Sequence, residues 1–586
     1  PLHSEWTGVR VRGCTTRQKE AVAAAVQVDA WNDNVFNAQS HFVRKSHAMT
    51  FLAPAAVAEI DALFTPWANE TSPGFMVAVT LGDDVVYQRC AGMADLAHGI
   101  ALSPRSVVRI ASQSKQFTVL LALMMEAEGK LSLDDDVREH CPWLPAYDQP
   151  ITLRQLAANT SGLRDILDTM ILAGIPILAP SSRAAARAIV ARQKSLNFPP
   201  DTDLLYSNSN FLLLSEILEQ VSGLSFNDLL RERITGPLGM HDTRLMVRDD
   251  EIYPRLATHH RRGPDGAWLK AAWGIAIGGE GGLVSSLEDM LAWQANLARP
   301  KVGDAAMIAR MEAPGAVING IASPYGLGLV TSLHRGLRCI GHSGWIAGSR
   351  SESIRIPERD LGIVLLANHD EFSPYALTRR IADIVLGLEA GPPLSPAAIA
   401  TLTECAGTYR EDGTSALIRI DSGGGTPSLV TSMGTTEVEE VAQGRFRPRT
   451  GLAPYDLLVQ ADGSIETEKF GRRRRFRPVE AAISEQDLLP VGCYRDGSSG
   501  LEARFYRGAD GPGMRLLSPF GTLELRLEPC ERDMFLAHPA SRSTHDAWRA
   551  APWELPWLFS VRCLPGAIVL NSDRSSDIVL HRLGDI

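Results

Sequence analysis

The stretch Val107-Val-Arg-Ile-Ala-Ser112-Gln-Ser-Lys115-Gln-Phe117-Thr-Val-Leu-Leu-Ala-Leu-Met-Met125 sets the fold that we expect of this chain. It begins with a short extended piece over 107–110, and the residues from Phe117 to Met125 are nearly all apolar. A helix that is apolar on most of its faces belongs in a protein interior. The sequence therefore predicts a buried helix over 113–128, ended by Gly129 at a position that favours glycine.

Ser112 and Lys115 form a Ser-x-x-Lys motif where this helix begins. Residues three apart share a helix face, so the two side chains are expected side by side. A buried lysine has a lowered pKa and can take the proton of a serine hydroxyl, while the helix start offers a backbone N–H to an oxyanion. The motif alone is weak, because about one such match is expected by chance in a chain of this length. Its place at a buried helix start makes Ser112 the candidate nucleophile.

Tyr206-Ser-Asn208 is the second segment of interest, and we expect it in a loop that leads into a helix from Asn210. A phenol whose pKa is lowered by a neighbouring ammonium can act as the general base for Ser112. Asn208 can then orient either Lys115 or a substrate carbonyl. The structural interpretations, a half-buried tyrosine and a helix cap, stay open for this segment alone.

His342-Ser-Gly344 is the third segment and falls in a predicted strand. Gly344 would let a substrate backbone approach closely, and the N–H of Trp345 would be a second oxyanion donor beside that of Ser112. A single histidine in a strand is often structural, which is the alternative for His342. No Cys/His cluster shows zinc-ligand spacing, so neither a metal nor another cofactor is expected.

Composition narrows the classes of partner. The 586 residues are 45% hydrophobic and 22% charged with a net charge of −10, which indicates several globular domains and does not favour nucleic acid. The one basic run, Arg472–Arg475, is predicted to be a solvated edge strand, with an anionic-ligand patch as the alternative. No apolar stretch reaches about 18 residues, so a membrane span is not expected. Eight scattered cysteines and the lack of a secretory pattern favour the cytoplasm, with the periplasm left open, as is a homodimer.

The order of the predicted elements gives an α+β organisation. A hairpin over 74–91, helices over 151–300 and strands over 325–368 indicate one antiparallel sheet with helices on both sides. After a linker at 389–396, Ala406–Arg410 and Val491–Arg495 repeat a Gly-x-Tyr-Arg pattern, and each is predicted to open a β-barrel unless the match is accidental. The expected domains are an extension over 1–50, a catalytic domain over 51–390, and barrels over 397–482 and 486–586.

The three motifs in this order resemble the serine β-lactamase and penicillin-recognising family, in particular its class C-like branch with Tyr-x-Asn. The supporting segments are Ile151–Leu156, Asn159–Asp165, Gly236–Met240, Gly278–Gly282 and Tyr325–Leu329. The resemblance implies a β-lactamase-like sandwich with Ser112 as nucleophile, Lys115 and Tyr206 as proton carriers, and His342 on the substrate-facing strand. Asn159 and Asp201 depart from the His and Gly that the family often has there.

His-x-Gly in place of Lys-Thr-Gly, together with two terminal barrels, is similar to the D-aminopeptidases and esterases of this branch. The layout is also similar to peptidases that degrade linearised microcystin. The resemblance therefore implies small linear peptide or amide substrates that contain D-residues, with a D-aminopeptidase, a carboxylesterase or a non-catalytic penicillin-binding-like protein as alternatives. It also implies a loop from the last barrel that reaches the site, for which Ser518–Thr522 is the candidate and a plain hairpin tip the alternative.

Overall fold

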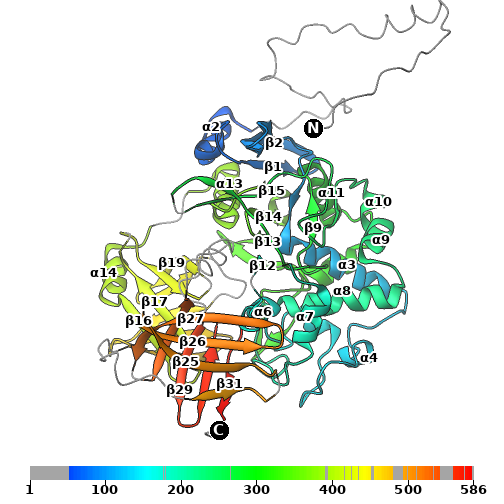
Figure 1. Ribbon diagram of the computed structural model, residues 1–586. Helices are drawn as coiled ribbons and strands as arrows, with labels where there is room; N and C mark the ends of the chain where they lie inside the picture. Colours follow the sequence, from blue (N-terminus) through cyan, green and yellow to red (C-terminus); the bar gives the residue numbers. More distant parts are fainter. Residues whose placement is uncertain are drawn as a thin grey trace, which may run out of the picture. The chain divides into compact units, whose positions relative to one another are not determined.

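The computed structural model describes residues 52–583 except 176, 179, 264, 390–392, 415, 424, 433, 450–454, 480–491, 498, 510, 532, 541–558 and 573. The predicted extension over 1–50, the middle of the predicted linker and the limit between the two barrels lie outside these residues. Figure 1 shows the remaining elements, coloured from the N-terminus to the C-terminus.

A six-stranded antiparallel sheet forms the centre of the first domain. Its strand order is β12 (Val330–His334), β13 (Leu337–Ile346), β14 (Ser349–Ile356), β15 (Leu361–Ala367), β1 (Phe75–Leu81) and β2 (Asp84–Ala91). The early hairpin joins the late strands through β1 and β15, with Val77 opposite Leu365. This confirms that the two ends of the domain close one sheet.

The two faces of the sheet are covered by different helices, because side chains alternate along each strand. Phe75, Val77 and Val79 of β1 pack with α2 (Pro54–Leu63) and α13 (Pro374–Leu386), in one apolar core. Met76 and Ala78 face the other core, which holds α3 (Ser114–Ala127) and α11 (Leu287–Ala298). Helix α3 is buried along nearly its whole length, as its apolar run predicts, and Gly129 follows it with a left-handed φ of 68°.

A helical lobe follows α3 in the chain. Its helices are α4 (Val137–His140), α5 (Leu153–Ala157), α6 (Ile166–Leu172), α7 (Arg183–Val190), α8 (Asn208–Ser222), α9 (Phe226–Leu230), α10 (Gly236–Leu238) and α12 (Ala305–Glu312). Helix α8 begins at Asn208, two residues earlier than expected, because the Asp165 carboxylate accepts the Asn208 N–H and so caps the helix from another segment. Asp165 also caps its own helix, α6. One buried carboxylate thus fixes two helix starts.

Short strands complete the domain around the helical lobe. Strand β9 (Leu283–Ser285) lies between β5 (Val108–Arg109) and β6 (Arg244–Leu245), and the remaining pairs are β3 (Met93–Asp95) with β4 (Ile100–Ala101), β7 (His260–Arg262) with β8 (Trp268–Lys270), and β10 (Val317–Ile318) with β11 (Ile321–Ala322). Asn159 and Asp201 both have left-handed backbones, with φ of 58° and 59°. Both departures from the family pattern are thus residue types that tolerate this conformation.

Helix α14 (Pro396–Glu404) leads into two closed antiparallel barrels of eight strands each, as predicted. The first has β16 (Gly407–Glu411), β17 (Leu417–Asp421), β18 (Ser428–Thr431), β19 (Gly434–Ala442), β20 (Arg445–Pro448), β21 (Asp456–Val459), β22 (Ile465–Lys469) and β23 (Arg472–Pro478). The second has β24 (Cys493–Arg495), β25 (Glu502–Gly508), β26 (Gly511–Ser518), β27 (Gly521–Glu531), β28 (Met534–Pro539), β29 (Phe559–Leu564), β30 (Ala567–Asn571) and β31 (Ile578–Arg582). The repeated tyrosines, Tyr409 and Tyr494, are both buried on the first strand of their barrel.

The prediction of a solvated edge strand for Arg472–Arg475 is confirmed for its exposure, since three of the four residues are exposed, but wrong for the edge. These residues lie on β23 and pair with β22, whereas β16 pairs with the next residues, Phe476–Pro478, and so closes the barrel. Arg473 is exposed and pairs with Glu466 and Glu468 of the neighbouring strand β22, whereas Arg474 pairs with Asp203 of the helical lobe at 3.1 Å. The basic run is therefore partly a contact between domains.

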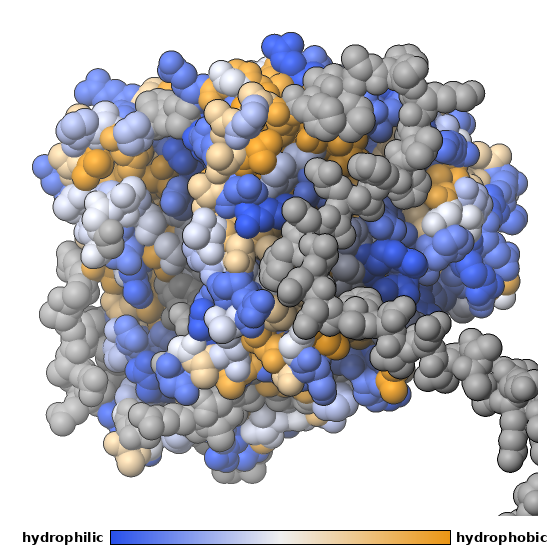
Figure 2. Space-filling model, turned by 90° about the horizontal axis from the view of Figure 1, so that it is seen from above, coloured by the Kyte–Doolittle hydropathy of each residue, from blue (hydrophilic) through white to orange (hydrophobic). Residues whose placement is uncertain are grey.

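The surface mixes side chains of both kinds. Figure 2 shows hydrophilic and hydrophobic residues interspersed over the face that it presents. Large exposed hydrophobic residues include Ile252, Leu333 and Val317. Within the part of the chain that the structure describes, no helix combines the length and the hydropathy needed to cross a bilayer.

Candidate active site

Ser112 lies in a 3-10 turn, Ala111–Gln113, that joins β5 to α3. Ala111 has a left-handed φ of 48°, which is uncommon for a residue with a Cβ and turns the chain sharply just before Ser112. The turn is fastened by Ser114, whose hydroxyl donates to the Ala111 carbonyl at 2.6 Å. At this position the backbone N–H of Ser112 has no partner within the turn, as an oxyanion donor requires.

Lys115 is fully buried and lies beside Ser112. Its Nζ is 3.1 Å from Ser112 Oγ and 2.9 Å from Asn208 Oδ1, and it also contacts the Glu280 carbonyl oxygen. Burial lowers the pKa of Lys115 to about 7, in line with our expectation. Two of its three partners can only accept hydrogen bonds. A neutral amine satisfies both with its two N–H groups and turns its lone pair to the Ser112 hydroxyl.

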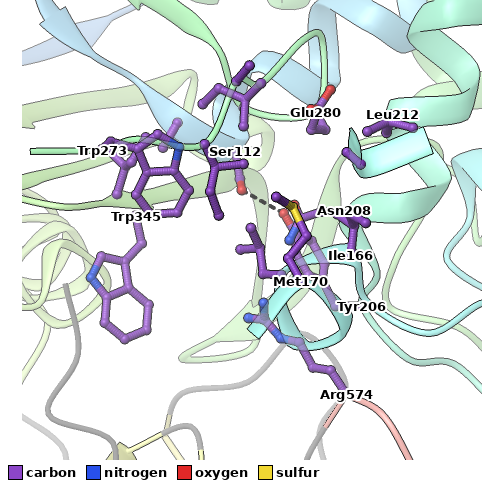
Figure 3. Close-up of a pocket in the computed structure, with 18 of the residues that line it drawn as sticks. Ser112, Ile166, Met170, Tyr206, Asn208, Leu212, Trp273, Glu280, Trp345 and Arg574 are labelled. Atoms are coloured by element: carbon purple, nitrogen blue, oxygen red, sulfur yellow. Dashed lines mark hydrogen bonds between the residues drawn. The ribbon is translucent and has the colours of Figure 1, made fainter. Parts of the chain in front are cut away.

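The Tyr206 phenol donates a hydrogen bond to Ser112 Oγ at 2.7 Å (Figure 3). It therefore meets the same oxygen as Lys115. Burial raises the pKa of Tyr206 well above its usual value. The expectation that a neighbouring ammonium lowers this pKa is therefore wrong: loss of water around the buried phenol raises it more than the Ser112 hydrogen bond and the Arg574 charge lower it. Tyr206 holds its proton at neutral pH and is suited to give it away, whereas Lys115 is suited to take one.

Asn208 stands at the first position of α8 and has its amide fixed at both ends. Its Nδ2 donates to Asp165 at 2.8 Å, which leaves Oδ1 directed to Lys115. Of the predicted roles, orienting Lys115 fits these contacts. The sequence marked the Asn159–Asp165 segment as typical of the family but gave no sign that Asp165 would hold Asn208.

His342 lies on β13 and is buried at the cavity wall. Tyr325 O–H and His342 Nε2 are 3.1 Å apart, and His342 Nδ1 lies 2.6 Å from the Ser343 carbonyl oxygen, so the ring donates to that carbonyl and accepts from Tyr325. Burial and then the nearby Lys115 lower the pKa of His342 to about 3, which keeps it neutral. Among the described residues neither ring nitrogen contacts Ser112, Lys115 or Tyr206, so a catalytic role for His342 stays a prediction.

The structure shows a packing reason for a glycine at position 344 that we did not expect. A Cβ there would lie 2.0 Å from the Ile110 carbonyl oxygen and 2.3 Å from Ser351 Oγ. The glycine lets β13 pack against the segment that carries Ser112, and its contact with a substrate backbone stays a prediction. Its neighbour Trp345 does line the cavity, and its N–H stays a predicted oxyanion donor.

A cavity of about 180 Å³ opens in front of Ser112 (Figure 3). Most of its wall is apolar, and includes Ile166, Met170, Leu212, Trp273, Ile275 and Ile277. Two charged side chains also reach it, Glu280 from the loop before β9 and Arg574 from the loop between β30 and β31 of the second barrel. Arg574 was missed because nothing in the local sequence marks a residue that meets the site through tertiary contact alone.

The predicted loop at Ser518–Thr522 is a hairpin tip between β26 and β27, the alternative that the sequence left open. It packs on the lobe away from Ser112: the Ser518 hydroxyl donates to the Ala173 carbonyl at 2.6 Å. A Cβ on Gly174 would lie 2.5 Å from Thr522 N, so that glycine admits the tip. A loop of the last barrel does reach the cavity, but it is the one that carries Arg574.

This geometry suits acyl transfer. A hydroxyl, an amine of near-neutral pKa and a protonated phenol converge on one oxygen at the mouth of a buried helix. These are the groups that a serine nucleophile needs for activation and for protonation of a leaving group. Within the described residues no group of three or more His, Cys, Asp or Glu side chains is arranged to hold a metal ion.

Comparison with known proteins agrees with the motifs. Residues 60–386, more than half of the chain, match the family model described as Beta-lactamase. A D-aminopeptidase from Cereibacter sphaeroides is 32% identical over 326 residues, which are 55% of this chain and 62%, less than two thirds, of that protein. A D-aminopeptidase from Gluconobacter oxydans is 29% identical over 472 residues, covering 76% of this chain and 86% of that protein.

Solved structures add the fold. The octameric penicillin-binding protein homologue from Pyrococcus abyssi aligns with a TM-score of 0.53 at 21% identity, and covers 72% of this chain and 100% of that one. The resemblance drawn from the three motifs is confirmed at the level of the family. This chain belongs to the beta-lactamase family.

Proposed function

We propose that the protein is a serine hydrolase that forms an acyl-enzyme at Ser112 and cleaves small peptides or amides. The observation that carries this proposal is the convergence of Lys115 Nζ and the Tyr206 phenol on Ser112 Oγ, at 3.1 and 2.7 Å. Both contacts lie within hydrogen-bond reach without any movement. An ordinary structural serine has no need of a buried lysine of near-neutral pKa beside it.

In the first step neutral Lys115 takes the Ser112 proton as Oγ attacks the substrate carbonyl carbon. The N–H groups of Ser112 and Trp345 stabilise the oxyanion. Tyr206 then gives its proton to the leaving nitrogen and regains one from the Lys115 ammonium. Water enters, the same two groups carry its proton in the reverse direction, and the acyl–Ser112 ester bond breaks to release the acid.

The proposed substrates are short linear peptides or amides with a D-residue next to the scissile bond, and linearised microcystin is one such peptide. Support comes from the D-aminopeptidases of Cereibacter sphaeroides and Gluconobacter oxydans, whose names give this chemistry. The cavity of about 180 Å³ suits one or two residues of a peptide, and its largely apolar wall suits an alkyl or aryl side chain.

In the first experiment the protein is labelled with a fluorophosphonate probe, and the mass of the intact chain is measured by mass spectrometry. The wild type is expected to gain one adduct, mapped to Ser112, and Ser112→Ala none. Ser114→Ala is the matched control, because Ser114 is a buried neighbour whose hydroxyl is bonded to the Ala111 carbonyl. Labelling of Ser112→Ala as strong as that of the wild type would refute the assignment of the nucleophile.

The second experiment compares D-alanine p-nitroanilide, its L-isomer, a linear peptide with D-residues and p-nitrophenyl butyrate. Turnover of the D-anilide and the peptide, with the L-anilide slower, supports a peptidase of D-residues. Turnover of the ester alone would defeat the peptidase and favour an esterase. Acylation without turnover of any of the four would favour a penicillin-binding-like protein.

A further inference from the structure

The loop between β30 and β31 brings a single positive charge from the second barrel into the cavity of the catalytic domain. Arg574 lies on this loop, and its guanidinium is 5.1 Å from the centre of the Tyr206 ring. Figure 3 shows the side chain reaching toward Tyr206 and Met170 from the side of the barrel. The group is therefore close to the phenol that serves the reacting serine, although it belongs to another domain.

The backbone of this loop is held firmly by the catalytic domain. Asn197 Nδ2 donates to the Arg574 carbonyl at 3.0 Å, and Asn197 Oδ1 accepts the Ser576 N–H at 2.9 Å. The buried Arg164 donates to the Ser576 carbonyl at 3.0 and 3.2 Å. The Ser572 hydroxyl also donates to the Asp168 carboxyl group. These contacts fix where the Arg574 side chain starts.

The guanidinium itself makes few polar contacts with the described residues. Among the described residues its one ion pair is with Asp165, at 3.6 Å and so beyond hydrogen-bond distance, and its side chain donates no hydrogen bond to any of them. Asp165 is already occupied by Asn208, whose N–H and Nδ2 both donate to the same oxygen, and by the Leu167 N–H. The side chain is 18% exposed, so its donors face the cavity with little water around them.

The other charged group on the wall, Glu280, interacts with groups of the protein itself, although its buried Oε2 has no hydrogen-bond partner among the described residues. Glu280 Oε1 accepts the Gly278 N–H at 2.8 Å. Although burial lowers the pKa of Arg183, the Glu280 and Glu219 carboxylates raise it above its usual value, which marks an attraction between Glu280 and that arginine. Among the described residues that line the cavity, Arg574 is the one Lys or Arg side chain, and a guanidinium offers paired N–H donors that match a carboxylate.

We propose that Arg574 binds a carboxylate of the substrate, so that the enzyme selects acidic or carboxyl-terminated peptides over neutral ones. This inference rests on the proposed function and names its substrate class. The carboxylate has two sources: the end of the leaving residue, or the side chain of the residue that is acylated. In both cases the acid makes one charge-assisted hydrogen bond to Arg574, in a cavity with little water, that its amide cannot make.

The experiment measures kcat/KM for two matched pairs of substrates. D-Ala-D-Ala against D-Ala-D-Ala-amide tests a carboxylate on the leaving residue, and D-glutamate against D-glutamine p-nitroanilide tests one on the acylated residue. The wild type is expected to prefer the acid in one pair by about 10- to 100-fold, since a hydrogen bond to a charged group is worth that factor. Arg574→Gln should lose this preference, and Arg574→Lys should keep part of it.

Arg192→Gln is the matched control. Arg192 also lies where the lobe meets the second barrel and stands over an aromatic ring, Phe520, at 5.0 Å, but it lines a separate cavity. It should leave the preference unchanged. Equal losses for acid and amide in Arg574→Gln, or a wild-type preference for the amide in both pairs, would overturn the inference. Failure of the proposed function is distinct, because the fluorophosphonate adduct at Ser112 would then also be missing.

Discussion

The two barrels share a fold and an opening motif, yet they meet the catalytic domain in different ways. The first supports the segment before Tyr206: Lys469 Nζ donates to the Leu204 carbonyl at 2.5 Å and pairs with Asp203 at 2.9 Å. The second sends Arg574 into the cavity itself. One barrel therefore acts on the position of a backbone, and the other on the charge that a substrate meets.

Removing the anchor of the second barrel should have the largest effect. Arg164→Met leaves the Ser576 and Ser195 carbonyls without their buried donor, at an expected cost of about 2–4 kcal/mol in the free energy of unfolding. With the loop released, kcat/KM for the preferred acid should fall about 100-fold. Thermal unfolding and steady-state kinetics measure the two quantities.

If Arg164→Met lost stability but kept its selectivity between acid and amide, the second barrel would not control the charge that a substrate meets, and the contrast between the two barrels would fail. Arg164→Lys restores one donor and should recover part of both quantities. A variant that unfolds completely is resolved by the kinetics of Arg574→Gln, which leaves the backbone of the loop in place.

Removing the support from the first barrel should have a smaller and uniform effect. Lys469→Met takes a buried donor from Leu204 and leaves Asp203 paired with Arg474 alone, so Tyr206 is held less firmly. We expect kcat/KM to fall about 10-fold for acid and amide alike. A change in the ratio between them would contradict the division between the two barrels.

Arg473→Gln is the control for Lys469→Met. Arg473 belongs to the same hairpin of the first barrel, but its partners Glu466 and Glu468 stay within that barrel and its side chain is 58% exposed. Exposed ion pairs contribute little, so its kinetics should match those of the wild type.

The smallest effect should appear in the pH profile. Burial lowers the pKa of Lys115 to about 7; among the neighbouring charges Glu280 and Asp165 raise it, and Arg574 lowers it. Because the amine must be neutral to accept a proton, kcat/KM should rise as pH increases through about 7. Arg574→Gln removes a positive neighbour, so the pKa of Lys115 should rise. The pH at which kcat/KM increases should then be higher than in the wild type by less than about one unit. Lys469→Met should leave this pH unchanged, and a downward shift in Arg574→Gln would contradict this.

Features that follow from local pattern could be predicted from the sequence. The apolar run after Ser112 can be satisfied only in an interior, and the unbroken apolar run at Phe75–Val79 only in a sheet covered on both faces. The spacing of Ser112 and Lys115 and the order of the three motifs also predicted the centre of the site. The structure places Ser112, Lys115, Tyr206 and Asn208 within hydrogen-bond distance of one another in a chain of contacts.

What could not be predicted depends on contacts between distant segments. The rise in the pKa of Tyr206 follows from burial that only the folded chain creates. Lys115 is held by the backbone carbonyl of Glu280, an atom that every residue has and no motif marks. The strand that carries Arg472–Arg475 is not an edge, because β16 pairs with its following residues and closes the barrel. The close approach of the Ile110 carbonyl, which requires a glycine at position 344, also comes from a distant segment.

The loop that carries Arg574 is anchored by its backbone while its side chain is free of hydrogen bonds to the described residues. Replacing that side chain leaves the backbone anchors of the loop in place and removes the 3.6 Å ion pair with Asp165. Natural variation or a saturation library at this position can thus shift which peptides are accepted, at little risk to folding. In this protein, the preference for particular peptides can therefore change without any substitution in the catalytic residues.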